Sequence, residues 1–158
     1  MRTSVDVHNF LIERDVPHEV FLARGRLRSA DRIAAVLDLS PTEVGRVILY
    51  ETSEGPVAVV IPSDRQPDDA LVAKAVGDPS ATPTSSERAA EMTDFLPSSV
   101  PPAGFPDGVR VILDRDLNRD VVLYFPAGEP RAVLKIRGKD LRKATRAKVA
   151  RVSGNAGH

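Results

Sequence analysis

Sulfur chemistry and clustered histidines are missing from this chain. Among its 158 residues there is no cysteine, and the only histidines are His8, His18 and His158. The lack of thiols excludes disulfide bonds, cysteine nucleophiles and thiolate metal sites. The histidines form no His-x-x-x-His pair, and neighbouring carboxylates such as Asp68 and Asp69 are more often solvated than bound to a cation. We therefore expect no metal and no cofactor.

Several other signatures are absent as well. No apolar run approaches the roughly 20 residues of a membrane span, and the N-terminus lacks the apolar core of a signal peptide. There is no glycine pattern of a dinucleotide-binding or nucleoside-triphosphate-binding loop, and no Gly-x-Ser-x-Gly to present a nucleophilic serine. These absences favour a soluble, cytoplasmic protein. The length predicts one domain, residues 1–152, followed by a flexible tail, residues 153–158.

Charge is balanced overall but uneven along the sequence. There are 22 basic and 22 acidic residues, yet residues 131–158 hold nine Lys and Arg against the single Asp140. That segment carries a formal charge of +8, and residues 1–130 carry −8. A basic end on an acidic domain predicts an anionic partner, first of all a nucleic-acid backbone, with Arg142, Lys143 and Arg146 as candidate contacts. The alternative is a solvated basic helix face.

Helical and strand patterns mix without a regular alternation, which predicts a mixed α/β fold of the α+β type. Capping residues and apolar spacing predict five helices, from Thr3 or Ser4 to before Pro17, from the N-cap Ser29 to before Pro41, over 68–76, over 85–92 with a cap at Thr84, and over 139–152. Apolar, β-branched runs predict strands at 18–22, 44–50, 56–61, 109–113, 121–125 and 132–136. We expect a hairpin with a five-residue loop from the second and third strands and a meander from the last three. The result is a curled, mostly antiparallel sheet flanked by helices.

One loop, residues 95–108, is rich in proline and glycine and runs into an apolar strand that ends at Asp114. Proline fixes φ and glycine permits conformations closed to other residues, so this loop is built to hold a shape. Ser98, Ser99, Ala103 and Gly104 are small enough to let a ligand approach the main chain. A pocket wall and a rigid connection without a ligand are equally compatible with this pattern.

Two charged residues border apolar strands. Arg46 interrupts the apolar run 44–50, where its guanidinium faces water, a partner or an anionic ligand such as a phosphate. Asp114 follows the apolar run 111–113, and it either orients Arg46, contacts a ligand hydroxyl, or begins the turn to Asn118.

The order of these motifs resembles the YbaK-like family of aminoacyl-tRNA deacylases, which is related to the editing insertion of bacterial prolyl-tRNA synthetase. The likeness runs from about Val5 to Val152. Residues 44–49, Val-Gly-Arg-Val-Ile-Leu, are similar to the family's Val-x-Lys-Thr-Leu strand, and residues 98–104 are similar to its Gly-Gly-Val-Ser-Pro-Phe-Gly loop. Residues 113–117 resemble its Ile-Asp-Glu-Ser-Leu segment, and Ala127-Gly128 matches its Ala-Gly turn.

The resemblance implies metal-free hydrolysis of the ester between a mischarged small amino acid and the tRNA 3′ end. In such relatives, backbone groups and the ribose hydroxyl of the substrate position the attacking water. The acceptor end of tRNA is then the expected partner, and an aminoacyl-tRNA synthetase is a further candidate. Carried over residue by residue, the catalytic group is Arg46, Ser98, Ser99 and Asp114, and the substrate pocket is Val100, Pro102, Ala103, Gly104 and Gly128.

The chain departs from the family pattern at two places. Arg46 replaces the usual lysine, and Ser98-Ser99 replaces the paired glycines. If both serines point inward, the pocket is smaller and favours Ala or Ser esters over Leu or Phe. The alternative to an enzyme is a non-catalytic module on the same fold that binds tRNA ends, a nucleotide or a protein.

Overall fold

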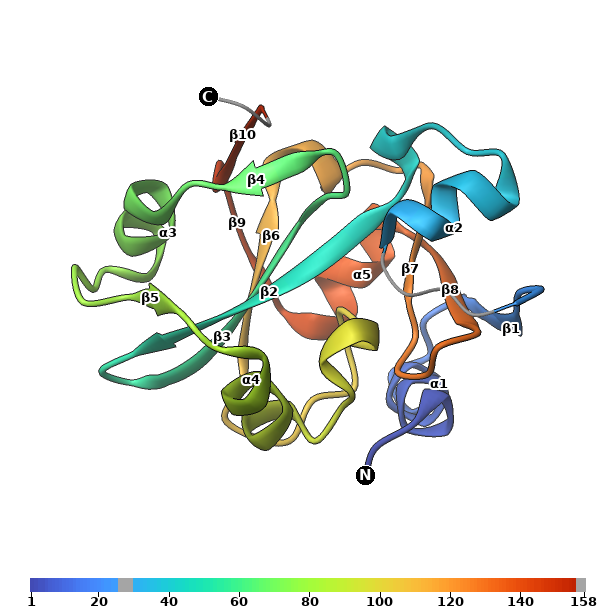
Figure 1. Ribbon diagram of the computed structural model, residues 1–158, viewed down its shortest axis with the longest axis horizontal. Coiled ribbons are helices and arrows are strands. Elements are labelled where there is room, and N and C mark those ends of the chain that lie inside the picture. Colours follow the sequence, from blue (N-terminus) through green and yellow to red (C-terminus); the bar gives the residue numbers. More distant parts are fainter. Residues whose placement is uncertain (26–29, 156–158) are drawn as a thin grey trace.

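The chain adopts a mixed α/β fold with mostly antiparallel sheets, as the sequence predicts (Figure 1). The computed structural model describes residues 1–25 and 30–155. The helices of this part are α1 (Ser4–Glu13), α2 (Ala30–Leu37), α3 (Asp69–Val76), α4 (Ser86–Thr93) and α5 (Gly138–Thr145). The strands are β1 (Glu19–Leu22), β2 (Gly45–Thr52), β3 (Gly55–Pro62), β4 (Arg65–Pro67), β5 (Thr82–Pro83), β6 (Arg110–Asp114), β7 (Val122–Pro126), β8 (Ala132–Arg137), β9 (Lys148–Ala150) and β10 (Ser153–Asn155).

Three sheets organise the molecule. The largest has the order β5-β2-β3-β6-β9, a smaller one has the order β1-β8-β7, and β10 pairs with β4 at one end (Figure 1). β3 is buried on both faces because Ala58 and Val60 belong to the main core, whereas Val59 and Ile61 belong to a second cluster with Val72 of α3. The main core lies between the two larger sheets and includes residues of α1 and α5.

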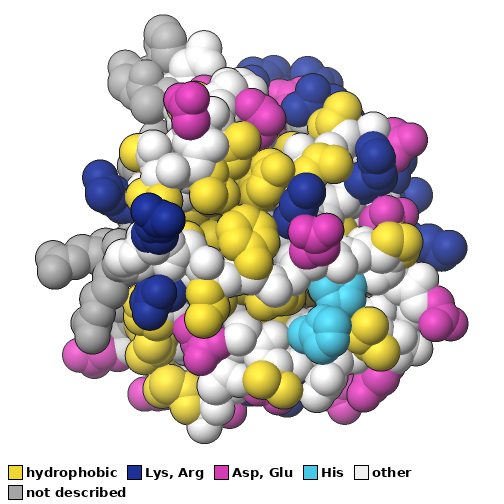
Figure 2. Space-filling model, turned by 90° about the vertical axis from the view of Figure 1, so that its right-hand side faces the viewer, with side chains coloured by type: hydrophobic (Ala, Val, Ile, Leu, Met, Phe, Trp, Pro, Cys, Tyr) yellow, Lys and Arg dark blue, Asp and Glu magenta, His cyan; other side chains and the backbone are white. Residues whose placement is uncertain are grey.

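The small sheet carries the third apolar cluster on its other face. Ile33 and Ala34 of α2 pack with Val133 of β8, and the partly buried Phe21 and Tyr124 adjoin them. Figure 2 views this side of the molecule and shows hydrophobic side chains gathered near its middle. In the described ranges, none of the helices is long and apolar enough to cross a membrane.

Most local signals act as the sequence predicts. Thr3 caps α1 with a complete capping box, in which its side chain accepts from the first turn and Asp6 accepts from its N–H. Gly77 ends α3 in the left-handed conformation at φ 72°. The predicted cap of α2, Ser29, lies outside the described residues. α4 is capped by Ser85 rather than Thr84.

The expected hairpin of β2 and β3 forms, but its loop is shorter than predicted. Thr52 pairs with Gly55, so only residues 53 and 54 connect the strands instead of five residues. Gly55 has a φ of +109°, which admits this tight turn. Of the three strands of the predicted meander, β7 and β8 pair antiparallel as expected, but the place of β6 is wrong. β6 pairs parallel with β3 and β9, because Ile112 and Leu113 have apolar partners on both faces of the large sheet.

The C-terminal helix is half as long as predicted. Arg146 takes a left-handed conformation (φ 56°) and its N–H bonds to the carbonyl of Arg142, which ends α5. The chain then forms β9, so Val149, which suggested a helical face, lies in a strand, and Val152 lies in the short connection between β9 and β10. Residues 153–155 form β10 against β4 instead of a flexible tail, and residues 156–158 lie outside the described part. Extension is favoured here because β9 completes the edge of β6 and β-branched valines suit a sheet.

Candidate functional site

The loop of residues 97–104 meets the turn at Ala127-Gly128. The N–H of Gly128 donates to the carbonyl oxygen of Ser99 over 2.8 Å. Gly128 has a φ of +90°, and a Cβ at this position would lie 2.9 Å from the Cε1 atom of Phe95. The close approach therefore needs glycine, and it packs the turn against the buried Phe95 ring.

The two serines of the loop have different environments. Ser98 is exposed, whereas Ser99 is only 1% exposed, and its Oγ has no hydrogen-bond partner in the described part of the chain. An unpaired buried hydroxyl costs about 1–3 kcal/mol. The exposed Ser98 does not fit the expectation that both serines point inward, whereas the Ser99 hydroxyl lies inside the fold.

The other end of the loop is fixed to the start of α1. Val100, Pro102, Ala103 and Gly104, the predicted pocket residues, are all buried. Gly104 has a φ of +88°, and a Cβ there would lie 3.1 Å from the Cα of Val7.

Polar contacts with the N-terminal segment hold both the loop and the turn. Arg2 donates from Nη1 to the Gly104 carbonyl over 3.2 Å. The carboxylate of Glu129, next to Gly128, accepts from the N–H and the hydroxyl of Ser4. A carboxylate at the start of a helix is also favoured by the helix dipole. The first turn of α1 thus anchors the loop and the turn together.

Arg46 is half-buried on β2 and is held by groups of β4. Its Nη2 donates to the carbonyl oxygen of Arg65 over 2.7 Å and to Oε1 of Gln66 over 3.2 Å. The guanidinium is therefore oriented at the corner between β3 and β4, and it is not spread over the solvent face of the hairpin.

Asp114 is 1% exposed and begins the turn to Asn118, one of the three roles considered for it. One carboxylate oxygen accepts from the N–H of Asp116 over 2.9 Å. The other accepts from the N–H of Val152 over 3.2 Å and from the hydroxyl of Ser153 over 2.7 Å. The carboxylate thus joins the end of β6 to the C-terminal segment.

The surroundings of Arg46 and Asp114 adjoin each other. Arg65, whose carbonyl binds Arg46, forms an ion pair with Asp116 at 3.0 Å. These two residues also line a cleft of about 350 Å³ with Asp64 and Arg119. The predicted site residues therefore fall into two groups, one at the contact of Ser99 with Gly128 and one at the corner that holds Arg46 and Asp114.

The three basic residues proposed for tRNA do not share one surface role. All three are exposed, but Arg142 and Lys143 lie on α5, whereas Arg146 caps this helix and lines a separate cleft with Arg14, the residue that caps the end of α1. The sequence prediction treated all three residues as part of one helix over residues 139–152. It could not show that Arg146 differs from the other two, because α5 ends at Thr145, before Arg146.

The structure also brings together two histidines that are ten residues apart. Nδ1 of His8 lies 2.8 Å from Nε2 of His18, and Nδ1 of His18 bonds to the carbonyl of Val16. Figure 2 shows histidine side chains next to each other on the surface. Two histidines make an incomplete cation site, and no group of three or more His, Asp or Glu residues suited to a metal occurs in residues 1–25 and 30–155.

Comparison with known proteins identifies the class. The model of the aminoacyl-tRNA editing domain matches residues 25–144. The chain therefore belongs to the aminoacyl-tRNA editing domain family, which confirms the resemblance found in its motifs. No protein of curated function matches it in sequence.

Solved structures agree with this fold. A hypothetical protein, APE2540, shares 26% identity and superposes with a TM-score of 0.88 over 94% of this chain and 99% of its own. A protein described as a "putative trans-editing enzyme for prolyl tRNA synthetase" shares 22% identity with a TM-score of 0.86, over 98% of this chain and 99% of its own. A scaffold protein from a study of computational epitope grafting, also 22% identical, gives a TM-score of 0.84 over 98% and 99% of the two chains.

Proposed function

We propose that the protein is a trans-acting aminoacyl-tRNA deacylase that hydrolyses the ester between a small amino acid and the 3′ end of a mischarged tRNA. Membership of the editing domain family supports the substrate class. The observation that carries the site is the buried Ser99 hydroxyl, which lacks a partner in the described residues and lies beside the Ser99–Gly128 main-chain contact.

The reaction needs positioning more than a strong nucleophile. A water oxygen attacks the ester carbonyl carbon, the bond from that carbon to the ribose oxygen breaks, and the ribose oxygen takes up a proton. The products are the free amino acid and a tRNA with a free terminal hydroxyl. In our proposal the Ser99 hydroxyl contacts the aminoacyl group, and the stiff loop excludes bulky side chains. Oriented donors of this kind stabilise the developing oxyanion.

In this proposal the buried residues of the loop set the amino-acid preference. Val100, Pro102, Ala103 and Gly104 are buried and leave little room to expand. Each methylene in an apolar pocket changes affinity by only about 1–3 kcal/mol. Steric exclusion of large side chains therefore discriminates between amino acids more strongly than favourable contacts with small ones. We therefore expect Ala and Ser esters to be hydrolysed faster than Leu or Phe esters.

The test is release of amino acid from a panel of mischarged tRNAs, which includes Pro, Ala and Thr isoacceptors. Ser99→Ala is expected to lower kcat/KM by about 2–10-fold, the effect of one hydrogen bond. Ser98→Ala is the matched control, because Ser98 is the adjacent residue but is exposed. Absence of acceleration over buffer for every pair would overturn the proposal, and equal effects of the two substitutions would remove Ser99 from the site.

The second candidate is a non-catalytic module that binds tRNA ends. It is favoured by Arg46, whose guanidinium is held by Arg65 and Gln66 where relatives carry lysine. Arg46→Lys combined with Ser99→Gly restores the family pattern at the buried positions. Activity that appears only in this double variant would identify the natural chain as a binding module, whereas loss of parent activity in Arg46→Ala would support the deacylase.

A further inference from the structure

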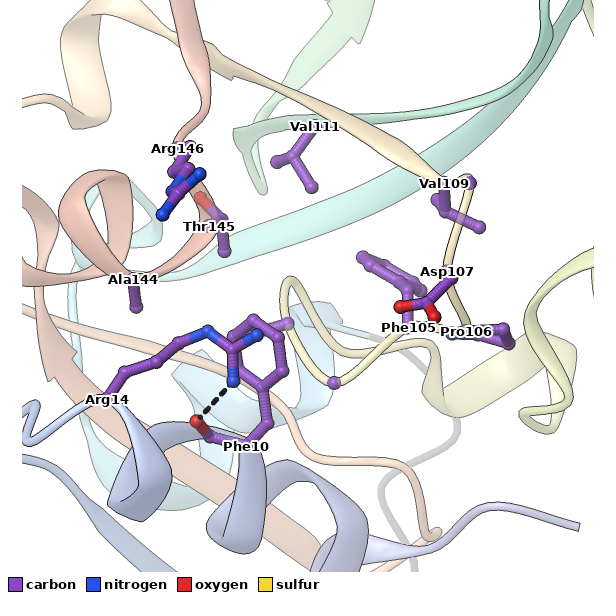
Figure 3. Close-up of a pocket in the computed structure, with 13 residues that line it drawn as sticks. Phe10, Arg14, Phe105, Pro106, Asp107, Val109, Val111, Ala144, Thr145 and Arg146 are labelled. Carbon is purple, nitrogen blue, oxygen red and sulfur yellow. Dashed lines mark hydrogen bonds between the residues drawn. The ribbon is translucent and has the colours of Figure 1, made fainter.

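A cleft of about 360 Å³ lies between α1, the segment of residues 103–111 and the end of α5 (Figure 3). Its size falls within the range of about 300–1,000 Å³ that is usual for small-molecule sites. Of the residues assigned to the aminoacyl site, Ala103 and Gly104 reach the edge of this cleft, whereas Ser99, Gly128, Arg46 and Asp114 do not line it. The cleft therefore lies on the other side of the loop from the Ser99–Gly128 contact, and we consider it as a site for a second ligand.

One side of the cleft carries two guanidinium groups from different helices. Figure 3 shows Arg14 of α1 and Arg146 at the end of α5 on the same side. The guanidinium of Arg146 forms no hydrogen bond or ion pair with the described residues. Arg14 lies 3.5 Å above the Phe10 ring and donates once, from Nη1 to the Phe10 carbonyl over 3.0 Å.

These guanidiniums have unused donors. The one ion pair of Arg14 is with the exposed Glu13 at 3.9 Å, and the left-handed cap fixes the backbone from which Arg146 extends. Each guanidinium presents five N–H donors in a planar fork that suits phosphate oxygens. Two such groups facing one cleft favour a phosphate between them.

The opposite side offers an aromatic face and a hydrogen-bond acceptor. Phe105 and Asp107 stand there, across from Phe10 and Arg14 (Figure 3). Phe105 is braced from behind by Phe95, edge to face, with ring centroids 6.2 Å apart. The carboxylate of Asp107 accepts no hydrogen bond from any residue that the structure describes. A carboxylate beside an aromatic ring suits a flat group with N–H donors, and nucleobases with an exocyclic amino group combine both properties.

We propose that this cleft binds a nucleoside monophosphate, with the phosphate between Arg14 and Arg146 and an amino-bearing base against Phe105 and Asp107. The nucleotide is either free or one residue of an RNA strand, since both present the same groups. A free amino acid would also match an arginine and an aspartate, but it leaves the Phe105 ring and most of the volume unused. The proposal does not depend on ester hydrolysis at Ser99.

The experiment is a titration of ¹⁵N-labelled full-length protein, followed by NMR, with AMP, CMP, GMP, UMP, inorganic phosphate, alanine and a short single-stranded RNA. We expect the nucleotides with an exocyclic amino group to bind more tightly than UMP or phosphate, with shifts at residues 104–109 and 144–146. Binding of the mononucleotides identifies a free-nucleotide site, and binding of the RNA alone at these residues identifies an RNA site.

Matched variants separate a built site from general charge. Arg146→Asn removes the guanidinium but keeps a residue that tolerates the left-handed cap, and it should weaken binding about tenfold or more. Arg142→Gln removes the same charge from the exposed face of α5 and should change little. Asp107→Asn should reduce the preference over UMP, and Ser99→Ala should leave binding unchanged. Equal losses in the Arg146 and Arg142 variants, equal affinity for phosphate alone, preferred binding of alanine, or no shift at the cleft would overturn the proposal.

Discussion

Replacement of Asp114 by alanine is expected to destabilise the fold rather than to act on the chemical step alone. The carboxylate accepts three hydrogen bonds, from the N–H of Asp116, the N–H of Val152 and the hydroxyl of Ser153. Val152 and Ser153 are both fully buried, so water cannot replace the lost acceptor. Each buried donor left unpaired costs about 1–3 kcal/mol, and the lost cap of the turn adds about 1 kcal/mol.

The expected loss is therefore about 3–7 kcal/mol, a large part of the roughly 5–15 kcal/mol by which domains of this size are stable. Equilibrium unfolding in urea, followed by circular dichroism, measures it. Asp114→Asn keeps one oxygen for the Asp116 N–H but turns an amide toward the donors of residues 152 and 153, so we expect an intermediate loss. Ser153→Ala removes one contact and should cost about 1 kcal/mol.

Three results would refute this reasoning. A loss below about 1 kcal/mol in Asp114→Ala would mean that the C-terminal segment does not depend on this carboxylate. If deacylation of mischarged tRNA disappeared in the same stably folded variant, Asp114 would be a catalytic residue, as the family motif suggests. Additivity of the Asp114→Asn and Ser153→Ala effects would also contradict the direct contact.

Three further predictions test other parts of the molecule. Gly128→Ala should destabilise by about 1–3 kcal/mol in thermal unfolding, because φ is +90° and the new Cβ would meet Phe95, whereas unchanged stability would mean that the turn can shift. Burial and the hydrogen bond to Asp69 raise the pKa of Tyr50 from its ordinary value of 10.0, so its stabilising effect is complete below that pH and declines above it as the unfolded phenol ionises. The urea midpoint should thus fall more steeply above pH 10 in the parent than in Tyr50→Phe, and parallel curves would contradict the raised pKa. Replacing Arg142 and Lys143 by alanine should reduce the salt dependence of tRNA binding by about 0.7–0.9 log units per lost phosphate contact, and an unchanged slope would return these residues to a solvated face.

Local signals in the sequence were sufficient for much of the fold. Thr3 begins α1 and Gly77 ends α3, as expected. The apolar runs around residues 44–50 and 56–61 pair in the predicted hairpin. A cap or a turn depends on a few neighbouring residues, so its energy is encoded within a short window. The same holds for the motif order that identified the family.

Which strands pair with one another could be learned only from the tertiary structure when the strands are distant in sequence. Strand β6 carries the pattern of a strand, but only the assembled sheet places it between β3 and β9, and this same pairing ends α5 at Thr145 and turns residues 148–150 into a strand. Spacing along one element cannot report such pairings, because they depend on which surfaces meet.

For the candidate sites, too, some features follow from the sequence and others only from the tertiary structure. The amino acids themselves determined that a small, stiff loop exists, that Arg46 interrupts an apolar strand, and that neither thiol chemistry nor a metal cluster of cysteines is available. Only the tertiary structure decided that Ser99 is buried while Ser98 is exposed, that Asp114 joins a segment 39 residues away, and that Arg146 and Arg14 line one cleft. Burial and side-chain partners follow from contacts between distant segments, and these contacts form only when the whole chain has packed.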